Sequence, residues 1–364
     1  MGVSTRGRRG RGIVAGTALT LLGVQAAMNY GIDTRKLYWA DIEYGTTVRN
    51  LSERKEEFPD RPIVVVLGTS RARNGFAADR LSEAVPGDAA PPLVLSASLS
   101  GASPLHYLLA LRRLIAIGIK PAGVVIEILP ALLGVDAAGV AGKPELSLDP
   151  ATDAYRLRAA DSALIRAYDG DRTWQWLRNW CEARAAPWYT CRYTLTGRYA
   201  ATWAPKENVT ALNNWRITIG PYGWHRIGMQ SVPEATAEAG RKVAAKFYRP
   251  RLAFAAADPK YDLLLRDLLR FCRDERIAVL GLVLMPESAV FRGWYPDETA
   301  RFVREYVDRI AADFGTVRID ASTWVPDEFF LDGHHLIEPG AYRFSDRFRT
   351  EVILPWMKSR GPAP

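Results

Sequence analysis

One apolar run and the turn after it dominate the pattern of hydrophobic and polar positions. Residues 63–67 read IVVVL, a continuous aliphatic run typical of strands that are buried on both faces. Gly68, Thr69 and Ser70 follow at once, and residues 71–74 predict a turn that opens a helix. Because open α/β sheets bind ligands at the carboxyl ends of their strands, Ser70 occupies a favourable position for chemistry.

Two interpretations of Ser70 remain open at this stage. Its hydroxyl group could act as a nucleophile, with the free N–H groups of the helix start holding an oxyanion. Serine is also a common N-cap residue, and in that role it would only satisfy backbone N–H groups. The apolar run alone does not separate these two roles.

Strand and helix signals alternate along most of the chain. Apolar runs predict strands, and apolar residues at helical spacing predict the helices between them. The predicted strands are residues 63–67, 93–98, 123–129, 277–284 and 317–319, and the predicted helices are 77–85, 104–117, 261–273, 296–314 and 339–356. This alternation predicts an α/β fold, a three-layer α/β/α sandwich with a mostly parallel sheet and right-handed crossovers.

The first 34 residues have the pattern of a membrane segment. Four arginines lie within residues 6–11, and no charged residue occurs from Gly12 to Ile32. An uncharged run of this length approaches the ~20 residues that span a bilayer, and the arginines favour a cytoplasmic N-terminus. We therefore expect a single-pass anchor with the main domain outside the cytoplasm, followed by a connector at residues 35–61. A signal peptide cleaved near Ala26, giving a secreted or periplasmic protein, is the alternative.

Charge and cysteine content narrow the function classes. The chain of 364 residues has a formal net charge of +8, of which the four N-terminal arginines supply half. With no zinc-finger spacing and no glycine-rich phosphate loop, the sequence predicts no nucleic-acid partner, no metal site and no cofactor. In an extracytoplasmic protein, Cys181 and Cys191 are close enough in sequence to form a disulfide, leaving Cys272 as a buried thiol.

A second candidate segment lies near the C-terminus. Two of the four histidines, His334 and His335, follow Asp332 in the stretch DGHHL. An aspartate three residues before a histidine can bind one ring nitrogen, leaving the other to accept a proton from a serine. The alternative is an aspartate cap followed by two solvated histidines.

The two stretches together resemble the SGNH (GDSL-like) hydrolase superfamily. GTS after the first strand and DGHHL near the end are similar to the first and last blocks of that family. The resemblance implies Ser70 as nucleophile, Asp332 as the orienting acid and His335 as the base, with His334 as a neighbour. It covers residues 61–135 and 270–357, and it is closer to the membrane-anchored cell-envelope branch, which includes D-alanyl-transfer and alginate O-acetylation proteins.

The middle blocks of the family are poorly kept. Of the usual Asn-x-Gly-x-x-Gly block, the stretch 96–101 retains only Gly101. The expected Gly-x-Asn-Asp block is replaced by residues 127–130, which read EILP and offer no asparagine donor. The resemblance therefore implies an oxyanion hole built from the backbone N–H groups of Ser70, Arg71 and Gly101. One missing donor can cost ~10²–10³ in rate.

An aromatic-rich insertion at residues 136–258 separates the two parts of the expected domain, 62–135 and 259–364. Its tryptophans and tyrosines, interleaved with polar residues, suit a carbohydrate-binding lid, or simply the core of a small insertion domain. Within it, the turn at residues 220–225 could approach the active cleft. Candidate substrate contacts, for each of which a purely structural role is the alternative, are Arg73, His106, Trp224 and His334.

These observations predict an extracytoplasmic serine esterase or O-acyltransferase of the SGNH type. Its substrate would be an ester-linked acyl group on envelope carbohydrate or lipid. The alternative is a non-catalytic envelope protein that keeps the fold and binds polysaccharide or a partner protein. The sequence does not distinguish hydrolysis from acyl transfer, and it does not identify the acyl group, the acceptor or the oligomeric state.

Overall fold

The computed structural model describes residues 5–34, 36–83, 91–135, 155–157, 161–168, 170, 173–206, 209 and 218–360. The chain divides into two compact units, which we call the helical unit (1–46 and 148–216) and the sheet unit (47–147 and 217–364). This division differs from the predicted one, because the predicted insertion 136–258 is shared between the two units. Its part 148–216 groups with the N-terminal helix, and its part 217–258 groups with the sheet.

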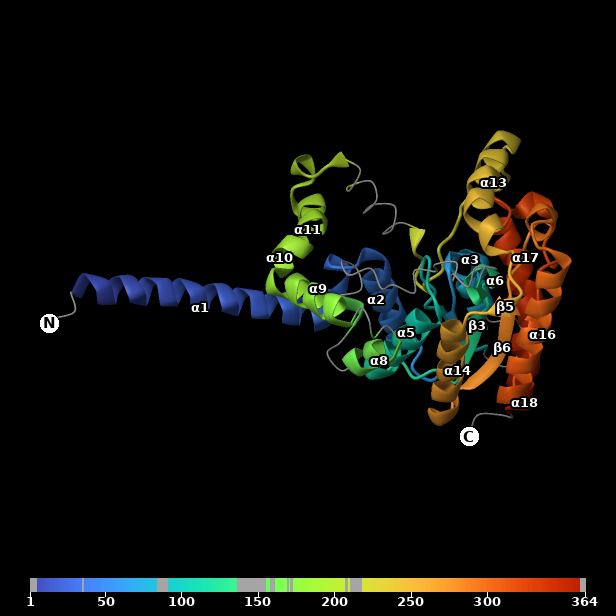
Figure 1. The fold of residues 1–364 in the computed structure, drawn as a ribbon, viewed down its shortest axis with the longest axis horizontal. Helices are drawn as coiled ribbons and strands as arrows, with labels where there is room; N and C mark the ends of the chain where they lie inside the picture. The colour runs from blue at the N-terminus through green and yellow to red at the C-terminus, as the bar shows by residue number, and fades with distance from the viewer. Residues whose placement is uncertain are drawn as a thin grey trace. The chain divides into compact units, whose positions relative to one another are not determined.

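A parallel five-stranded sheet forms the centre of the sheet unit (Figure 1). Its order is β2-β1-β3-β6-β7, and every neighbouring pair is parallel. The strands are Leu93–Ser96, Ile63–Leu67, Gly123–Glu127, Ala278–Leu284 and Arg318–Asp320 in that order. The predicted α/β class with a parallel sheet is thus confirmed. When only the five strands of this sheet are counted in chain order, their spatial order is 2-1-3-4-5, as in one common doubly wound topology. A separate antiparallel pair joins β4 (Gly134–Val135) to β5 (Ala256–Ala257).

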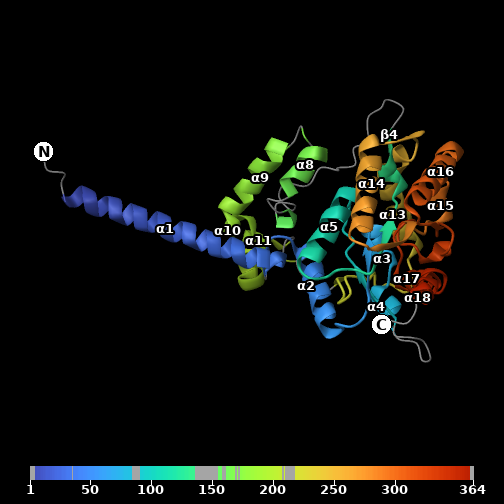
Figure 2. The ribbon, with the colours of Figure 1, turned by 90° about the horizontal axis from the view of Figure 1, so that it is seen from below.

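The central strands are buried on both faces, as their uninterrupted apolar sequences predict. Every residue of β1 and β3 is buried. Helices α5 (Pro104–Ala116) and α14 (Pro259–Asp274) pack against each other, and α17 (Glu338–Phe348) packs on α3 (Ser70–Gly75) and α4 (Ala78–Ser82) (Figure 2).

Phe76 shapes the segment after β1. It is buried and meets Phe344 and Phe348 edge-to-face, with ring centroids 4.8 and 4.9 Å apart. Its backbone is extended (φ −83°, ψ 101°), which ends α3 and starts the shorter α4. The helix predicted at 77–85 is therefore preceded by a separate helix, and the extended Phe76, whose ring is buried, lies between the two.

The last predicted helix, 339–356, is also divided. It consists of α17, a π-helical turn η7 (Arg349–Ile353) and α18 (Leu354–Ser359). The other elements of the sheet unit lie close to their predicted bounds or in stretches without a prediction. They are α6 (Pro130–Leu133), α13 (Glu234–Tyr248), η5 (Arg249–Arg251), α15 (Ala289–Arg292), α16 (Asp297–Phe314) and η6 (Asp327–Phe329).

The helical unit is built around α1 (Thr5–Thr34). The segment Arg11–Thr34 is long and apolar enough to cross a membrane. The remaining helices are η1 (Leu37–Trp39), α8 (Ser162–Tyr168), α9 (Thr173–Ala185), α10 (Pro187–Thr190), α11 (Arg192–Tyr199) and η4 (Ala201–Trp203), while α2 (Ile42–Glu57) contains the boundary between the units.

The expected disulfide does not form. Cys181 and Cys191 are both free thiols, the first exposed on α9 and the second buried after α10. Burial raises the pKa of Cys191 to about 12 and that of Cys272, also free, to about 12. The residues of the stretch 151–168 also predict a helix. Of this stretch the structure describes 155–157 and 161–168, which include α8, and the other residues lie outside the described part of the chain.

Candidate active site

The turn after β1 holds Ser70 at the first position of α3. Thr69, not Ser70, is the N-cap residue, and its Oγ1 accepts a hydrogen bond from the Arg71 N–H at 3.2 Å. The cap role considered for Ser70 is therefore filled by its neighbour, and the Ser70 hydroxyl is left for another contact. The Arg71 N–H, predicted to bind an oxyanion, instead donates to this cap.

The C-terminal segment forms a tight loop closed by backbone pairing. An isolated antiparallel bridge joins Phe330 to Leu336, and the Leu331 N–H donates to the His335 carbonyl at 2.9 Å. Inside the loop, Asp332 Oδ1 accepts the backbone N–H of His335 at 2.9 Å. The sharp reversal uses Gly333 at φ +97°, a conformation that favours glycine. The backbone of the loop thus holds the Asp332 carboxylate in place through its Oδ1 atom.

Ser70, His335 and Asp332 form a continuous hydrogen-bonded chain. His335 Nδ1 lies 2.7 Å from Asp332 Oδ2, and His335 Nε2 lies 2.8 Å from Ser70 Oγ. With the proton on Nδ1, the ring donates to the carboxylate and its Nε2 accepts the serine O–H. The two stretches predicted from opposite ends of the chain therefore meet in the geometry of a nucleophile, a base and an orienting acid.

The electrostatics of Asp332 favour its ionised form. Burial raises its pKa, but the hydrogen bond and charge of His335 outweigh burial and hold the pKa of Asp332 well below its usual range. The carboxylate is therefore ionised at neutral pH, ready to stabilise a positively charged imidazole.

This depressed pKa predicts a pH-dependent stability difference between the wild type and Asp332→Asn. The carboxylate contributes stability fully above the unfolded-state pKa of ~3.9, and the contribution is lost as the pH falls below that value toward the folded-state pKa. Urea unfolding at pH 5 and pH 3 should give a wild-type advantage that is smaller at pH 3. An advantage that grows toward pH 3 would contradict this assignment.

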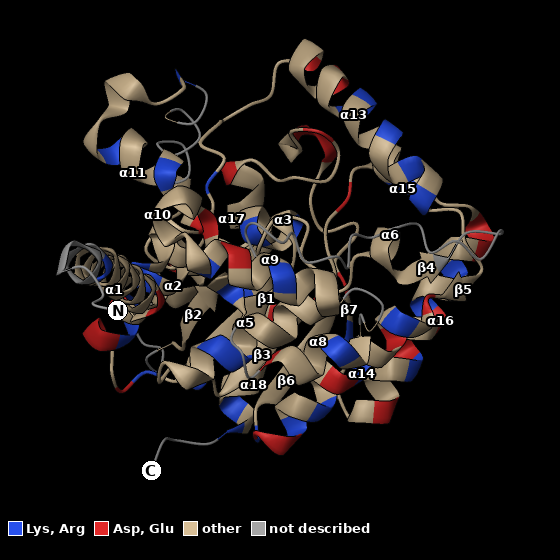
Figure 3. Cartoon of the chain, turned by 60° about the vertical axis from the view of Figure 1, so that its left-hand side comes forward, with Lys and Arg blue, Asp and Glu red and all other residues tan. Residues whose placement is uncertain are grey.

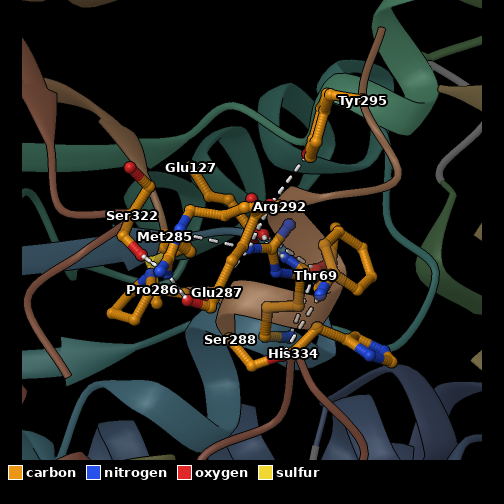
Figure 4. A network of polar contacts seen from close by, with 12 residues as sticks. Thr69, Glu127, Met285, Pro286, Glu287, Ser288, Arg292, Tyr295, Ser322 and His334 are labelled. Atoms are coloured by element: carbon orange, nitrogen blue, oxygen red, sulfur yellow. Dashed lines mark hydrogen bonds and ion pairs between the residues drawn. The ribbon is translucent and has the colours of Figure 1, made fainter. Parts of the chain in front are cut away.

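The buried carboxylate of Glu127 accepts hydrogen bonds from the turn that carries Ser70. It ends strand β3 and is completely buried. Its Oε2 accepts the Thr69 N–H at 2.6 Å, its Oε1 accepts the Thr69 hydroxyl at 3.1 Å, and it also accepts the backbone N–H of Ala72 (Figure 4). Glu127 therefore satisfies the backbone N–H groups of Thr69 and Ala72, one before and one after Ser70. The sequence signals only the absence of an asparagine at this block, so this role of Glu127 was not predicted.

Arg71 links Glu127 to a second buried carboxylate. Its Nη2 lies 2.9 Å from Glu287 Oε1, its Nε lies 4.0 Å from Glu127 Oε1, and Tyr295 donates to Glu287 at 2.8 Å. Burial raises the pKa of both Glu127 and Glu287, and Arg71 opposes that rise. The Arg71 guanidinium is therefore buried in this network and does not reach solvent.

Gly68 is required by the close approach of Glu127. A Cβ atom at residue 68 would lie 2.5 Å from Glu127 Oε2 and 2.4 Å from the Cβ of Ala72. The glycine of the GTS motif is therefore required by packing, which the sequence alone does not reveal.

The other predicted contacts are buried or bound to neighbouring groups. His106 forms a capping box with Ser103 at the start of α5, which is the structural alternative. Trp224 is buried and donates to the Asn74 carbonyl at 3.0 Å. Arg73 is also buried, which lowers its pKa to about 10. Gly101 lies in an exposed turn at φ +65°, and its oxyanion role stays a prediction.

His334 packs among aromatic rings. Its ring lies 4.6 Å from that of Tyr248 and 5.3 Å from that of Phe291. Burial, followed by the charge of His335, holds its pKa well below the usual range, so the ring is neutral. His334 is therefore a packing neighbour of His335, the role that the family resemblance implies for it, and not an open substrate contact.

One pair near the site was missed. Asn74 Nδ2 lies 3.1 Å from His225 Nδ1 and donates to the His225 carbonyl at 3.0 Å. Burial, then the charges of Arg73 and His335, lower the pKa of His225 to about 4. The turn at 220–225 thus reaches helix α3, and the position of Asn74 one helical turn after Ser70 was the available signal.

Helix α13 packs directly on the loop that carries the acid. A Cβ atom added at Gly240 would lie 2.8 Å from the Cβ of Asp332. We expect Gly240→Ala to displace Asp332 and to lower the initial rate of p-nitrophenyl acetate hydrolysis, the test reaction, 10- to 100-fold. Gly228→Ala is the control, since its added Cβ meets nothing within 4 Å. Equal activity of the two variants would mean that the loop accommodates the methyl group without moving the acid.

Asp332, His334 and His335 also form a group that could hold a metal ion. One potential metal-ligating atom from each lies within 4.8 Å of those of the other two. Both ring nitrogens of His335 already have partners in the hydrogen-bonded chain, and Asp332 accepts from its own loop. This donor set therefore fits proton transfer better than metal binding.

The chain matches no protein-family model, and no curated protein is significantly similar to it.

Proposed function

We propose that the sheet unit carries a serine-hydrolase site in a three-layer α/β/α domain of the SGNH type. The observation that carries the proposal is the chain from Ser70 Oγ through His335 to Asp332, with separations of 2.8 and 2.7 Å. The parallel sheet with Ser70 after its strand β1 and the acid and base on a loop beyond its last strand supports the same class.

The particular function we propose is an esterase or O-acyltransferase that acts on acyl esters of envelope carbohydrate or lipid. The apolar N-terminal helix supports work at a membrane, with the main domain outside the cytoplasm. The similarity of the GTS and DGHHL stretches to envelope acyl-transfer proteins supports the substrate class.

The reaction follows from the roles of the three residues. Ser70 Oγ attacks the ester carbonyl while its proton moves to His335 Nε2, and Asp332 stabilises the imidazolium that forms. The tetrahedral intermediate collapses, the C–O bond to the alcohol breaks, and His335 returns the proton to the leaving oxygen. Water or a sugar hydroxyl then attacks the acyl-enzyme in the same way, giving hydrolysis or transfer.

Covalent labelling tests the proposal directly. A fluorophosphonate probe should label the full chain in detergent at Ser70, and the labelled peptide should carry the adduct on that residue. Ser70→Ala should abolish labelling, while Ser98→Ala, which removes a buried serine two residues after β2, should not. Equal labelling of the wild type and Ser70→Ala would refute an activated serine.

A binding function is the second candidate. Two observations favour it. The Arg71 N–H donates to Thr69 Oγ1, and the expected Gly-x-Asn-Asp block lacks its asparagine, so two expected donors to an oxyanion are not offered. A non-catalytic protein would bind acylated polysaccharide or a partner protein without reacting with the probe. Unlabelled wild-type protein that binds such a glycan would support this function over the first.

A further inference from the structure

The helical unit exposes a set of large aromatic side chains beside the end of α1. We call this set the aromatic surface. Its members have exposed fractions from 43% to 84% and are Trp188, Tyr189, Tyr193, Tyr199 and Trp203. They lie on α10, α11 and η4, and no acidic residue occurs in residues 187–203, where Arg192 and Arg198 are the charged side chains.

The arginines are arranged along these rings. The Arg192 guanidinium lies 3.8 Å from the ring centre of Tyr189 and 4.2 Å from that of Tyr193. Figure 3 shows these basic positions on α11. Stacking keeps the charge at the level of the rings, so the surface is both aromatic and cationic.

The aromatic surface is fixed to the C-terminal end of α1. Arg184 of α9 pairs with Asp33 at 2.7 Å, Asn29 donates to the Arg184 carbonyl at 2.6 Å, and Tyr155 donates to Asn29 at 3.2 Å. Helix α10 contacts α1 as well, and both views of the fold place α9, α10 and α11 at this end (Figures 1 and 2). Arg198 reaches the ring of Tyr38, just after α1, at 5.4 Å.

The length of α1 sets the level of these contacts in a bilayer. About 20 helical residues cross a ~30 Å hydrocarbon core, so a helix that enters near Gly12 leaves near Gly31. The polar contacts of Asn29 and Asp33 therefore lie within two residues, about 3 Å, of the level where the helix leaves the hydrocarbon core. Exposed Tyr30 falls there too, in the position where tyrosine and tryptophan are enriched.

We propose that the aromatic surface lies in the headgroup region of the bilayer that α1 crosses, with its tryptophan and tyrosine rings inserted and its arginines on anionic phospholipid. The proposal rests on α1 as a membrane span and is independent of the esterase function. Aromatic rings with arginines are the composition of interfacial segments, and a carbohydrate-binding lid over the active site is not needed to explain them.

Tryptophan quenching by brominated lipid tests this placement, because α1 contains no tryptophan. The full chain is reconstituted in vesicles of phosphatidylcholine and phosphatidylglycerol, with or without bromine at carbons 6 and 7 of the acyl chains. We expect Trp188→Phe/Trp203→Phe to lose at least half of the quenching seen in the wild type. The matched control, Trp294→Phe/Trp324→Phe, removes two half-buried tryptophans of the sheet unit and should keep it.

Two results would overturn the proposal. One is equal quenching of the double variant and the wild type, which would place these rings outside the bilayer. The other is an emission change of Trp188 and Trp203 on adding soluble oligosaccharide with no quenching by brominated lipid, which would identify a carbohydrate site instead.

Discussion

Replacing Ser70 by alanine is expected to lower the rate of p-nitrophenyl acetate hydrolysis at least ~10³-fold, and His335→Ala should do the same. The serine is the proposed nucleophile, and its proton has one acceptor at 2.8 Å, the Nε2 of His335. Because the two residues act as a unit, the double variant should be about as slow as either single variant. The measurement is the initial rate of the full chain in detergent, with folding checked by circular dichroism.

His106→Ala is the matched control for the histidine variant. It removes another buried imidazole, but one that caps α5 and takes no part in the Ser70 chain. Its rate should stay within a few-fold of the wild type. If all three single variants hydrolyse the ester at the wild-type rate, the hydrolase proposal fails, and a binding function becomes the better explanation.

Glu127→Ala is expected to destabilise the protein by about 3–5 kcal/mol, the cost of removing one member of a buried charge network. The substitution leaves the Thr69 and Ala72 N–H groups and the Thr69 hydroxyl without their acceptor. It also removes one of two carboxylates around Arg71. The free energy of unfolding in urea measures the effect, and a shift of Ser70 should lower the esterase rate in the same variant.

Two further variants separate the network from the loss of any glutamate. Glu127→Gln keeps one acceptor oxygen and should cost about 1–3 kcal/mol. Glu351→Ala breaks an exposed pair with Arg347 and should change stability by less than about 0.5 kcal/mol. If Glu127→Ala unfolds at the wild-type urea concentration, the carboxylate does not hold the nucleophile turn.

The strands of the sheet and the three residues of the candidate site, Ser70, Asp332 and His335, could be predicted from the sequence. The uninterrupted apolar run before Ser70 can be satisfied only by burial on both faces, so β1 and its neighbours were predictable from composition. The spacing of Asp332 and His335 is local chemistry, since a three-residue loop brings a carboxylate to its own histidine. Both features depend on neighbours in sequence.

The contacts between distant segments had no such local signal. Arginine side chains are rarely buried without partners, and the partners of Arg71, Glu127 and Glu287, lie 56 and 216 residues away, respectively. The need for glycine at residue 68 likewise arises from Glu127 on another strand. Pairing across such separations depends on the register of the strands, which the sequence pattern does not specify.

By itself, then, the sequence determined the parallel α/β class, the apolar N-terminal helix and the three residues of the candidate site. Only the tertiary structure decided that these three residues share one hydrogen-bonded chain and that Glu127 supports it. It also decided that residues 148–216, much of the aromatic insertion, belong to one compact unit with α1. Hydrophobic periodicity and short-range geometry act within a few residues, whereas buried ion pairs and helix partners are chosen by the packing of the whole chain.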